Sequence, residues 1–472
     1  MPEIRTNSGL AADLLVELRR GDGVPLHRQV EASIRDSIRA GRLRLGTPLP
    51  PTRTLAADLG VSRGVIVEAY EQLTAEGYLT SRAGGYTQVA IGPQAAPAPP
   101  RAAAPRPRPR TDFGYGRADV ASFPRAAWLR SVSRVLTQTP SDRFGYLSGR
   151  GVPELHEVLA DYLNRVRGTS VRPDNVVICS GYAQGVSLLV QVLARGGARR
   201  IAIEDPAADD DARPAAVATG LEVVGIPVGH DGIRVDALDR IAADAVVLTP
   251  SHQWPTGAVL PAVSRACVLS WARRQGALVI EDDYDAEYRY DRAPIGAIQG
   301  LAPDQVAYAG TASKTLAPGL RLGWLVLPDR LVDHVAAAKV AADRGSPVID
   351  QLAFADFLAR GEFDRHLRRM RPVYRGRRDA LLAALREQLP DLAPAGIAAG
   401  MHLVAWLPDD LDEAAVVRAA ARRGLAISGV APYRELPGDG GLIFGYATLS
   451  ERAIAEGITL LAAAISDVRS AP

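Results

Sequence analysis

Short apolar runs alternate with helical segments from residue 112 to the C-terminus. A chain that alternates in this way is predicted to fold as a mostly parallel β-sheet with helices packed on its faces. The segment from about residue 370 has helix and strand patterns of its own, which predicts a smaller C-terminal subdomain. The apolar runs cover residues 176–179, 201–203, 221–226, 245–248, 278–280 and 306–309.

Lysine is almost absent from the chain. Of 55 basic side chains only two are lysines, Lys314 and Lys339. Unlike arginine, lysine can lose its proton and form a Schiff base with an aldehyde. Lys314 lies on a polar turn with Thr311, Ser313 and Arg321, whose hydroxyl and guanidinium groups suit a phosphate. Pyridoxal 5′-phosphate (PLP) carries an aldehyde and a phosphate, so the turn indicates a PLP site. The alternative is that Lys314 is a solvated loop lysine.

The acidic stretch 281–285 follows another apolar run. A carboxylate at the end of a buried strand is costly without a partner, and PLP needs a carboxylate beside its ring nitrogen. Together the lysine turn and this stretch resemble the fold-type I aminotransferases. The resemblance implies that Lys314 is the Schiff-base lysine and Asp282 the partner of the pyridine nitrogen. Tyr284 would then meet the cofactor's O3′ atom, and Arg321 its phosphate.

The same resemblance implies a wider set of cofactor-binding residues. A helix that opens after the run 176–179 offers backbone N–H groups to a phosphate. The turn 249–257 resembles the family's N-P-T-G turn, with Trp254 where asparagine usually lies. The alternative for the helix start is an ordinary strand-to-helix turn, and the alternative for His252 in the turn 249–257 is a structural role. The implied residues are Gly181, Tyr182 and Ala183 on the helix, His252 and Gln253 on the turn, Thr311 and Ser313, and Tyr146 reaching the partner subunit's phosphate.

Residues up to 91 follow a different pattern. A helix over 26–38 precedes two helices separated by Gly60, and two short apolar strands follow. This order predicts a winged helix-turn-helix, whose second motif helix enters the DNA major groove. Residues 1–90 hold 11 arginines, no lysine and 10 acidic residues, so charge does not distinguish DNA binding from a small helical interaction module.

The order of residues 50–63 resembles the GntR-type regulators. Their pattern P-x-x-R-x-L-A-x-x-L-G-V-S-R is matched throughout this segment. The resemblance implies phosphate contact by one arginine, base contacts at the start of the second helix, and minor-groove contact by the wing. In that order the DNA-binding residues are Arg53, then Ser62, Arg63 and Gly64, then Arg82 and Gly84.

The complete chain resembles the MocR family of PLP-dependent transcription regulators. The expected parts are a winged helix over 1–91, a Pro-, Ala- and Arg-rich linker over 92–111, and an aminotransferase-like domain over 112–472. The resemblance implies double-stranded DNA and PLP as partners, a head-to-tail homodimer, and an effector that is PLP or a small amine or amino acid. Some members of the family control vitamin B6 synthesis.

Three departures from the aminotransferase pattern bear on activity. Ala208 stands where an aromatic residue stacks on the PLP ring, and His156 stands where arginine is common. The run 442–447 lacks the arginine that clamps a substrate carboxylate; Arg434 is the nearest candidate. These departures favour a sensor over an enzyme. An active aminotransferase with a DNA-binding appendage, and a regulator with a vestigial PLP site, are the alternatives.

Composition argues against a disulfide-bonded, zinc-binding, secreted or membrane-spanning protein. The net charge is +2, and the two cysteines form neither a disulfide framework nor a zinc pattern. The N-terminal segment lacks the continuous apolar core of a signal peptide, and no run reaches the length of a membrane span. A cytoplasmic, nucleoid-associated protein is expected, with no metal site.

Overall fold

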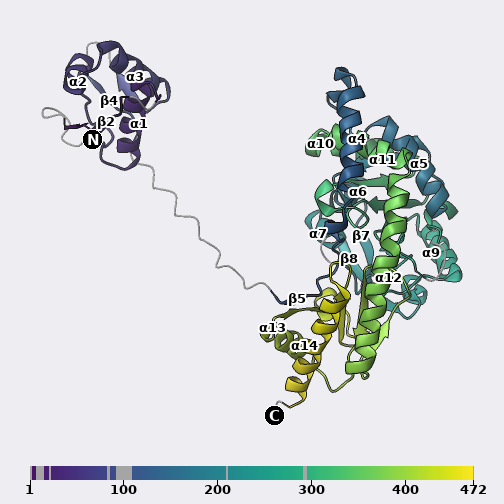
Figure 1. Ribbon diagram of the computed structural model, residues 1–472. Helices are drawn as coiled ribbons and strands as arrows, with labels where there is room; N and C mark the ends of the chain where they lie inside the picture. The colour runs from purple at the N-terminus through teal and green to yellow at the C-terminus, as the bar shows by residue number, and fades with distance from the viewer. Residues whose placement is uncertain are drawn as a thin grey trace. The chain divides into compact units, whose positions relative to one another are not determined.

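A computed structural model describes residues 3–6, 15–20, 23–81, 86–91, 109–208, 211–290 and 295–470. The chain divides into two compact units, Met1–Arg106 and Pro107–Pro472 (Figure 1). Among the described residues, no helix combines the length and apolar character that a membrane span requires.

The first unit is a winged helix-turn-helix, as predicted. Its core is formed by apolar residues such as Ile34, Leu55, Ile66 and Leu73, which three helices and a hairpin bury together. Gly60 ends the second helix in the left-handed conformation. The elements are α1 (Leu26–Arg39), α2 (Thr52–Leu59), α3 (Arg63–Ala75) and the hairpin β3 (Leu79–Ser81) with β4 (Thr87–Val89), and also a strand pair absent from the prediction, β1 (Glu3–Thr6) with β2 (Leu15–Leu18).

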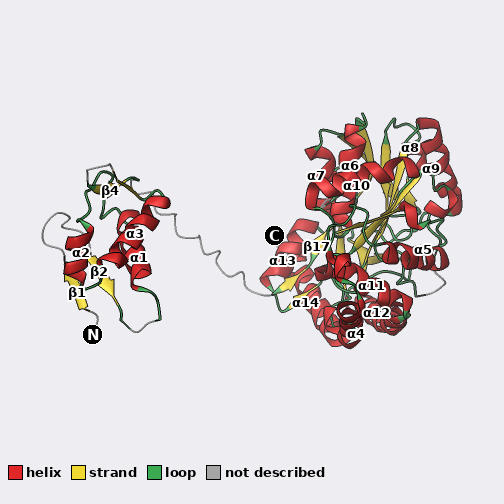
Figure 2. Ribbon diagram, turned by 90° about the horizontal axis from the view of Figure 1, so that it is seen from above, coloured by secondary structure: helices red, strands yellow, loops and turns green. Residues whose placement is uncertain are grey.

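An eight-stranded sheet organises the second unit and confirms the predicted fold class. Five neighbouring strands are parallel, and β13 runs antiparallel to both its neighbours. The core strands are buried on both faces because helices cover both (Figure 2). In sheet order the strands are β6 (Val176–Cys179), β13 (Gly323–Val326), β12 (Val306–Thr311), β11 (Leu278–Asp283), β10 (Ala245–Leu248), β7 (Arg200–Asp205), β8 (Glu222–Gly229) and β9 (Gly232–Ile233).

Helices pack around this sheet in two groups. The apolar faces of α6, α7 and α10 share a core on one side, while α8 and α9 share a core on the other. The helices of the unit's larger part are α4 (Arg125–Gln138), α5 (Pro153–Arg167), α6 (Tyr182–Arg195), α7 (Ala212–Ala218), α8 (Val235–Leu238), α9 (Ala262–Gln275), α10 (Asp329–Asp343), α11 (Val348–Ala359) and α12 (Glu362–Gln388).

The smaller subdomain is built around a four-stranded sheet. The 27-residue helix α12 runs from the large part to the small part, where α14 packs along it (Figure 1). Strand β5 (Thr111–Asp112) pairs with β16 (Leu425–Ala426), so residue 111, expected at the end of the linker, belongs to the folded subdomain. The remaining elements are β14 (Ala393–Ala395), β15 (His402–Trp406), α13 (Glu413–Arg422), β17 (Ser428–Gly429), β18 (Gly441–Gly445) and α14 (Glu451–Arg469).

Candidate DNA-reading helix and cofactor pocket

The start of α3 presents the residues expected to read DNA. Ser62, Arg63 and Gly64 are exposed there, as is Arg53 on α2. The first turn of α3 contains no acidic residue, so nothing in that turn repels a phosphate. Buried residues behind α3 fix its orientation, and the Tyr70 hydroxyl donates a hydrogen bond to the Pro50 carbonyl at 2.9 Å. The wing residues Arg82 and Gly84 lie outside the described residues.

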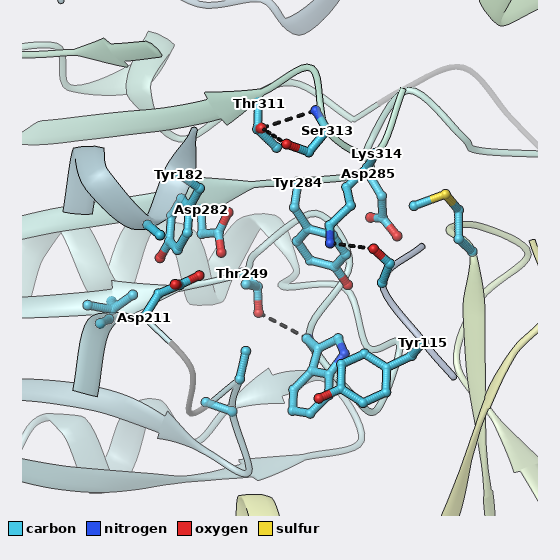
Figure 3. Close-up of a pocket in the computed structure, with 18 of the residues that line it drawn as sticks. Tyr115, Tyr182, Asp211, Thr249, Asp282, Tyr284, Asp285, Thr311, Ser313 and Lys314 are labelled. Atoms are coloured by element: carbon cyan, nitrogen blue, oxygen red, sulfur yellow. Dashed lines mark hydrogen bonds between the residues drawn. The ribbon is translucent and has the colours of Figure 1, made fainter. Parts of the chain in front are cut away.

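A cavity of about 320 Å³ opens where β7, β10, β11 and β12 end (Figure 3). The carboxyl ends of parallel strands are the usual ligand position in an open α/β sheet. Predicted residues that line it are Lys314, Asp282, Tyr284, Arg321, Tyr182, Ala183, Thr311 and Ser313. Residues that the sequence prediction missed also line it, among them Tyr115, Gly116, Glu204, Asp211, Thr249 and His402.

Lys314 points into this cavity from the turn after β12. Its Nζ atom donates a hydrogen bond to the Gly116 carbonyl at 2.6 Å (Figure 3). Gly116 has φ 72°, and a Cβ atom there would lie 3.1 Å from Nζ, so glycine suits both the backbone and the amine. The Thr311 hydroxyl donates a hydrogen bond to the Ser313 hydroxyl at 3.0 Å, and this bond stiffens the turn. The amine therefore has a defined position.

Asp282 lies at the end of β11, one strand from Lys314. Burial is the main cause that raises the pKa of its carboxyl well above the usual range, and the charges of Asp283 and Asp211 raise it further. Its Oδ1 atom is shielded from solvent and has no hydrogen-bond partner among the described residues. A buried oxygen of this kind suits a protonated ring nitrogen, which would supply both a donor and a positive charge.

Arg321 and the start of α6 form the third side of the site. The Arg321 Nη2 atom donates to the Ser180 carbonyl at 2.5 Å. Gly181 has φ 92°, and a Cβ atom there would lie 2.9 Å from the same Nη2 atom, so glycine lets the guanidinium approach the helix end. Backbone N–H groups and a guanidinium together suit a phosphate.

Tyr284 is held by a buried histidine. Its hydroxyl donates to the His252 carbonyl at 2.9 Å, and His252 Nδ1 lies 3.1 Å from an Asp285 oxygen. Ligand atoms of His252, Asp285 and His402 lie within 4.8 Å of one another. The His402 Nε2 atom forms a hydrogen bond with the Pro255 carbonyl, and burial lowers the pKa of His402 to about 3. We interpret the group as a hydrogen-bond network that orients Tyr284.

Five residues singled out from the sequence do not line the cavity: Tyr146, Gly181, His252, Gln253 and Arg434. Gln253 directs its amide to the Pro206 carbonyl and to Thr256, and therefore holds the turn together behind the pocket. His252 also lies behind the wall, and Tyr146 is 93% exposed. The Arg434 guanidinium packs over Trp406 at 5.9 Å and donates to the Asp439 carbonyl, so it faces a different cleft. Among the described residues, Arg434 therefore does not line the cavity that contains Lys314.

Comparison with known proteins is consistent with both units. Residues 26–89 match the bacterial regulatory proteins of the gntR family, and residues 113–458 match the aminotransferases of class I and II. A probable rhizopine catabolism regulatory protein, MocR, from Rhizobium meliloti is 34% identical, with 97% of each chain covered. This chain belongs to the MocR-type transcription regulators of the GntR superfamily. As a MocR-type regulator it is a DNA-binding protein with an aminotransferase-like unit.

Two further relatives of this MocR-type chain are informative. The pyridoxine biosynthesis regulator PdxR from Corynebacterium glutamicum is 32% identical over 94% of this chain and 96% of that protein. An α-aminoadipate aminotransferase from Thermus thermophilus, solved with a phosphopyridoxyl-leucine, superposes with a TM-score of 0.68 at 26% identity, covering 76% of this chain and 93% of that one. The shared family and fold imply PLP as the cofactor, and the Asp282 oxygen, the Lys314 amine and the Arg321–Gly181 corner fit its three functional groups.

We expect Asp282→Asn to weaken PLP binding by at least about tenfold, because a neutral amide loses a charge-assisted hydrogen bond to the ring nitrogen. An absorbance titration of the apoprotein with PLP measures this. Asp333→Asn, on the exposed face of α10, is the matched control and should bind PLP like the wild type. Equal affinity of Asp282→Asn and the wild type would contradict the role given to Asp282.

Proposed function

We propose that this chain is a homodimeric regulator that binds PLP through Lys314 and couples occupancy of that pocket to DNA binding by α3. One observation carries the proposal. A single chain joins an exposed Arg63 at the start of a reading helix to a pocket with two matched groups. Lys314 lies on the turn after β12, and on the neighbouring strand β11 the Asp282 Oδ1 atom has no hydrogen-bond partner among the described residues. When bound, PLP would supply an electron sink and a covalent attachment point, and a regulator that only senses a ligand would use the attachment point.

The residues around the pocket support sensing more than turnover. Arg321 is the one arginine that lines the described part of the pocket, and it is committed to the Ser180 corner. A substrate carboxylate therefore has no guanidinium partner there, although aminotransferase substrates are usually oriented by one. The regulated process is proposed to involve PLP or an amine. The relative from Corynebacterium glutamicum, named for pyridoxine biosynthesis, supports PLP loading itself as one signal.

A head-to-tail dimer is part of this proposal. Leu129 and Leu136 on α4 are 64% and 54% exposed, and Tyr146 nearby in sequence is 93% exposed. Leu129 and Leu136 are seven residues apart and so share one face of α4. Apolar side chains grouped in this way mark a candidate interface, and a two-fold axis would use the same face of both copies. Tyr146 would then reach the partner subunit's phosphate. The protein would act in the cytoplasm, where its DNA lies.

Arg63→Ala is expected to weaken binding to the chain's own upstream DNA by about fivefold or more, since one lost base contact costs about 1–3 kcal/mol. A gel-shift titration measures the affinity. Arg28→Ala is the control, because Arg28 is an exposed arginine on α1, outside the two helices of the helix-turn-helix motif. If both variants bind like the wild type, α3 is not the reading helix.

The coupling is tested by repeating the titration with and without PLP. We expect PLP to change the DNA affinity of the wild type and to leave that of Lys314→Ala unchanged. Incubation of the PLP-loaded protein with an amino acid and a keto acid, followed by product analysis, tests the enzyme alternative. Steady formation of a new keto acid would favour an aminotransferase, and an unchanged DNA affinity would overturn the sensor proposal.

A further inference from the structure

The charges that line the cofactor pocket are unequal. Four carboxyl groups line its described wall, on Glu204, Asp211, Asp282 and Asp285. The cationic side chains on the same wall are Lys314 and Arg321. PLP would add a negative phosphate, placed against Arg321, and a positive ring nitrogen, placed against Asp282. The carboxyl groups that remain beside the cofactor are those of Glu204, Asp211 and Asp285. The space left beside the cofactor therefore has a surplus of negative charge, which favours a cation and disfavours an anion.

Both cations are already engaged. Arg321 donates to the Ser180 carbonyl and packs against Gly181, and Lys314 donates to the Gly116 carbonyl. Binding a free carboxylate in this cavity would require it to lose water without gaining a charged partner from the described wall. Transfer of an unpaired carboxylate from water is among the costliest steps in recognition.

Glu204 and Asp211 contribute to this surplus in different ways. Glu204 accepts hydrogen bonds from the Thr249 backbone N–H at 2.9 Å and from its hydroxyl at 2.6 Å. Burial raises the pKa of Glu204 to about 7, so a nearby cation would favour its ionised form. Asp211 precedes α7, and its carboxyl group points toward Tyr182 and Asp282 beside it (Figure 3). The charge of Asp211 raises the pKa of both groups.

Aromatic rings form the wall below Lys314. The Tyr115 and Trp254 rings lie 4.8 Å apart, and Tyr433 meets Trp254 edge to face at 4.7 Å. The Tyr115 hydroxyl donates to the Tyr433 hydroxyl at 2.8 Å, which fixes the rings. Tyr115 lies on the side of the cavity that Lys314 faces in Figure 3. Aromatic faces bind the apolar body of a ligand and attract a cation.

We propose that the effector of this regulator is a small organic amine that carries no carboxylate. Its apolar body would lie on the Tyr115–Trp254 wall, and the carboxyl groups of Asp211 and Glu204 would provide the negative field that holds its charge. The proposal rests on the PLP-binding function proposed above, since the amine occupies the same pocket. It excludes α-amino acids as the preferred ligands.

The test compares pairs of ligands that differ only by a carboxylate. Tyramine is compared with tyrosine, and 1,4-diaminobutane with ornithine, by calorimetric titration of the PLP-loaded, full-length protein. In each pair we expect the amine to bind at least about tenfold more tightly, as an unpaired buried carboxylate costs more than 1.4 kcal/mol. Tighter binding of tyrosine or ornithine, or binding of neither amine, would overturn the proposal.

Asp211→Asn provides a second measurement. Loss of one negative charge should weaken the binding of 1,4-diaminobutane by about fivefold or more. Asp333→Asn is the control and should bind 1,4-diaminobutane with wild-type affinity. Unchanged affinity in Asp211→Asn would remove Asp211 from the proposal. Formation of the PLP absorption band in the wild type separates the two failures. Without the band, PLP binding itself fails; with the band but with amino acids preferred, only the amine proposal fails.

Discussion

Lys314→Ala is expected to abolish the visible absorption band that appears when PLP is added, and PLP should then leave the protein during gel filtration. The cause is chemical. Alanine has no nucleophile, and Lys339 is fully buried and paired with Asp343, so the second lysine does not replace the first. Ultraviolet–visible absorption spectra of the wild type and of Lys314→Ala measure this band.

The chain supplies an internal control for this result. Borohydride reduction of the PLP-loaded wild type, followed by peptide mapping, should place the label on Lys314 and none on Lys339. Lys314→Arg is the matched variant, because arginine keeps the positive charge near Gly116 but does not form a Schiff base. It should lose the band as completely as Lys314→Ala. A band that survives in either variant would show that the cofactor is held elsewhere.

Arg167→Met is expected to destabilise the second unit by about 3–5 kcal/mol, because it leaves a buried charge unpaired. Arg167 is fully buried, and its Nε atom donates to Asp283 at 2.7 Å. The same guanidinium donates to the Ser251 hydroxyl at 3.0 Å and to the Ile295 carbonyl at 2.7 Å. Urea unfolding followed by circular dichroism would show a lower midpoint for the transition of this unit.

Arg172→Met is the control for that experiment. Arg172 pairs with Asp329, and both side chains are more than 60% exposed, so the loss should lie between 0 and about 1 kcal/mol. Arg167→Met should also weaken PLP binding, because Asp283 is next to Asp282 and anchors the end of β11. A midpoint shift in Arg167→Met no larger than in Arg172→Met would contradict the account of this buried pair.

Residues close in sequence account for the parts that were predictable. The alternation of apolar runs predicted the large sheet, and the order of caps and breaks predicted the winged helix. Lys314 and Asp282 were predicted because each lies in a polar stretch after an apolar run, and the resemblance to fold-type I aminotransferases then gave their roles. The scarcity of lysine made Lys314 conspicuous without any structure. Their functional roles remain predictions that the variants above test.

Residues far apart in sequence account for the rest. The sequence by itself determined the two folds, the lysine and its carboxylate, since local periodicity and strand ends are encoded within a few neighbouring residues. The tertiary structure decided that Gly116 receives the Lys314 amine and that Tyr115 joins Trp254 and Tyr433. These partners are separated by well over one hundred positions and meet only when the sheet edge and the small subdomain close on each other, because packing of whole elements brings them together.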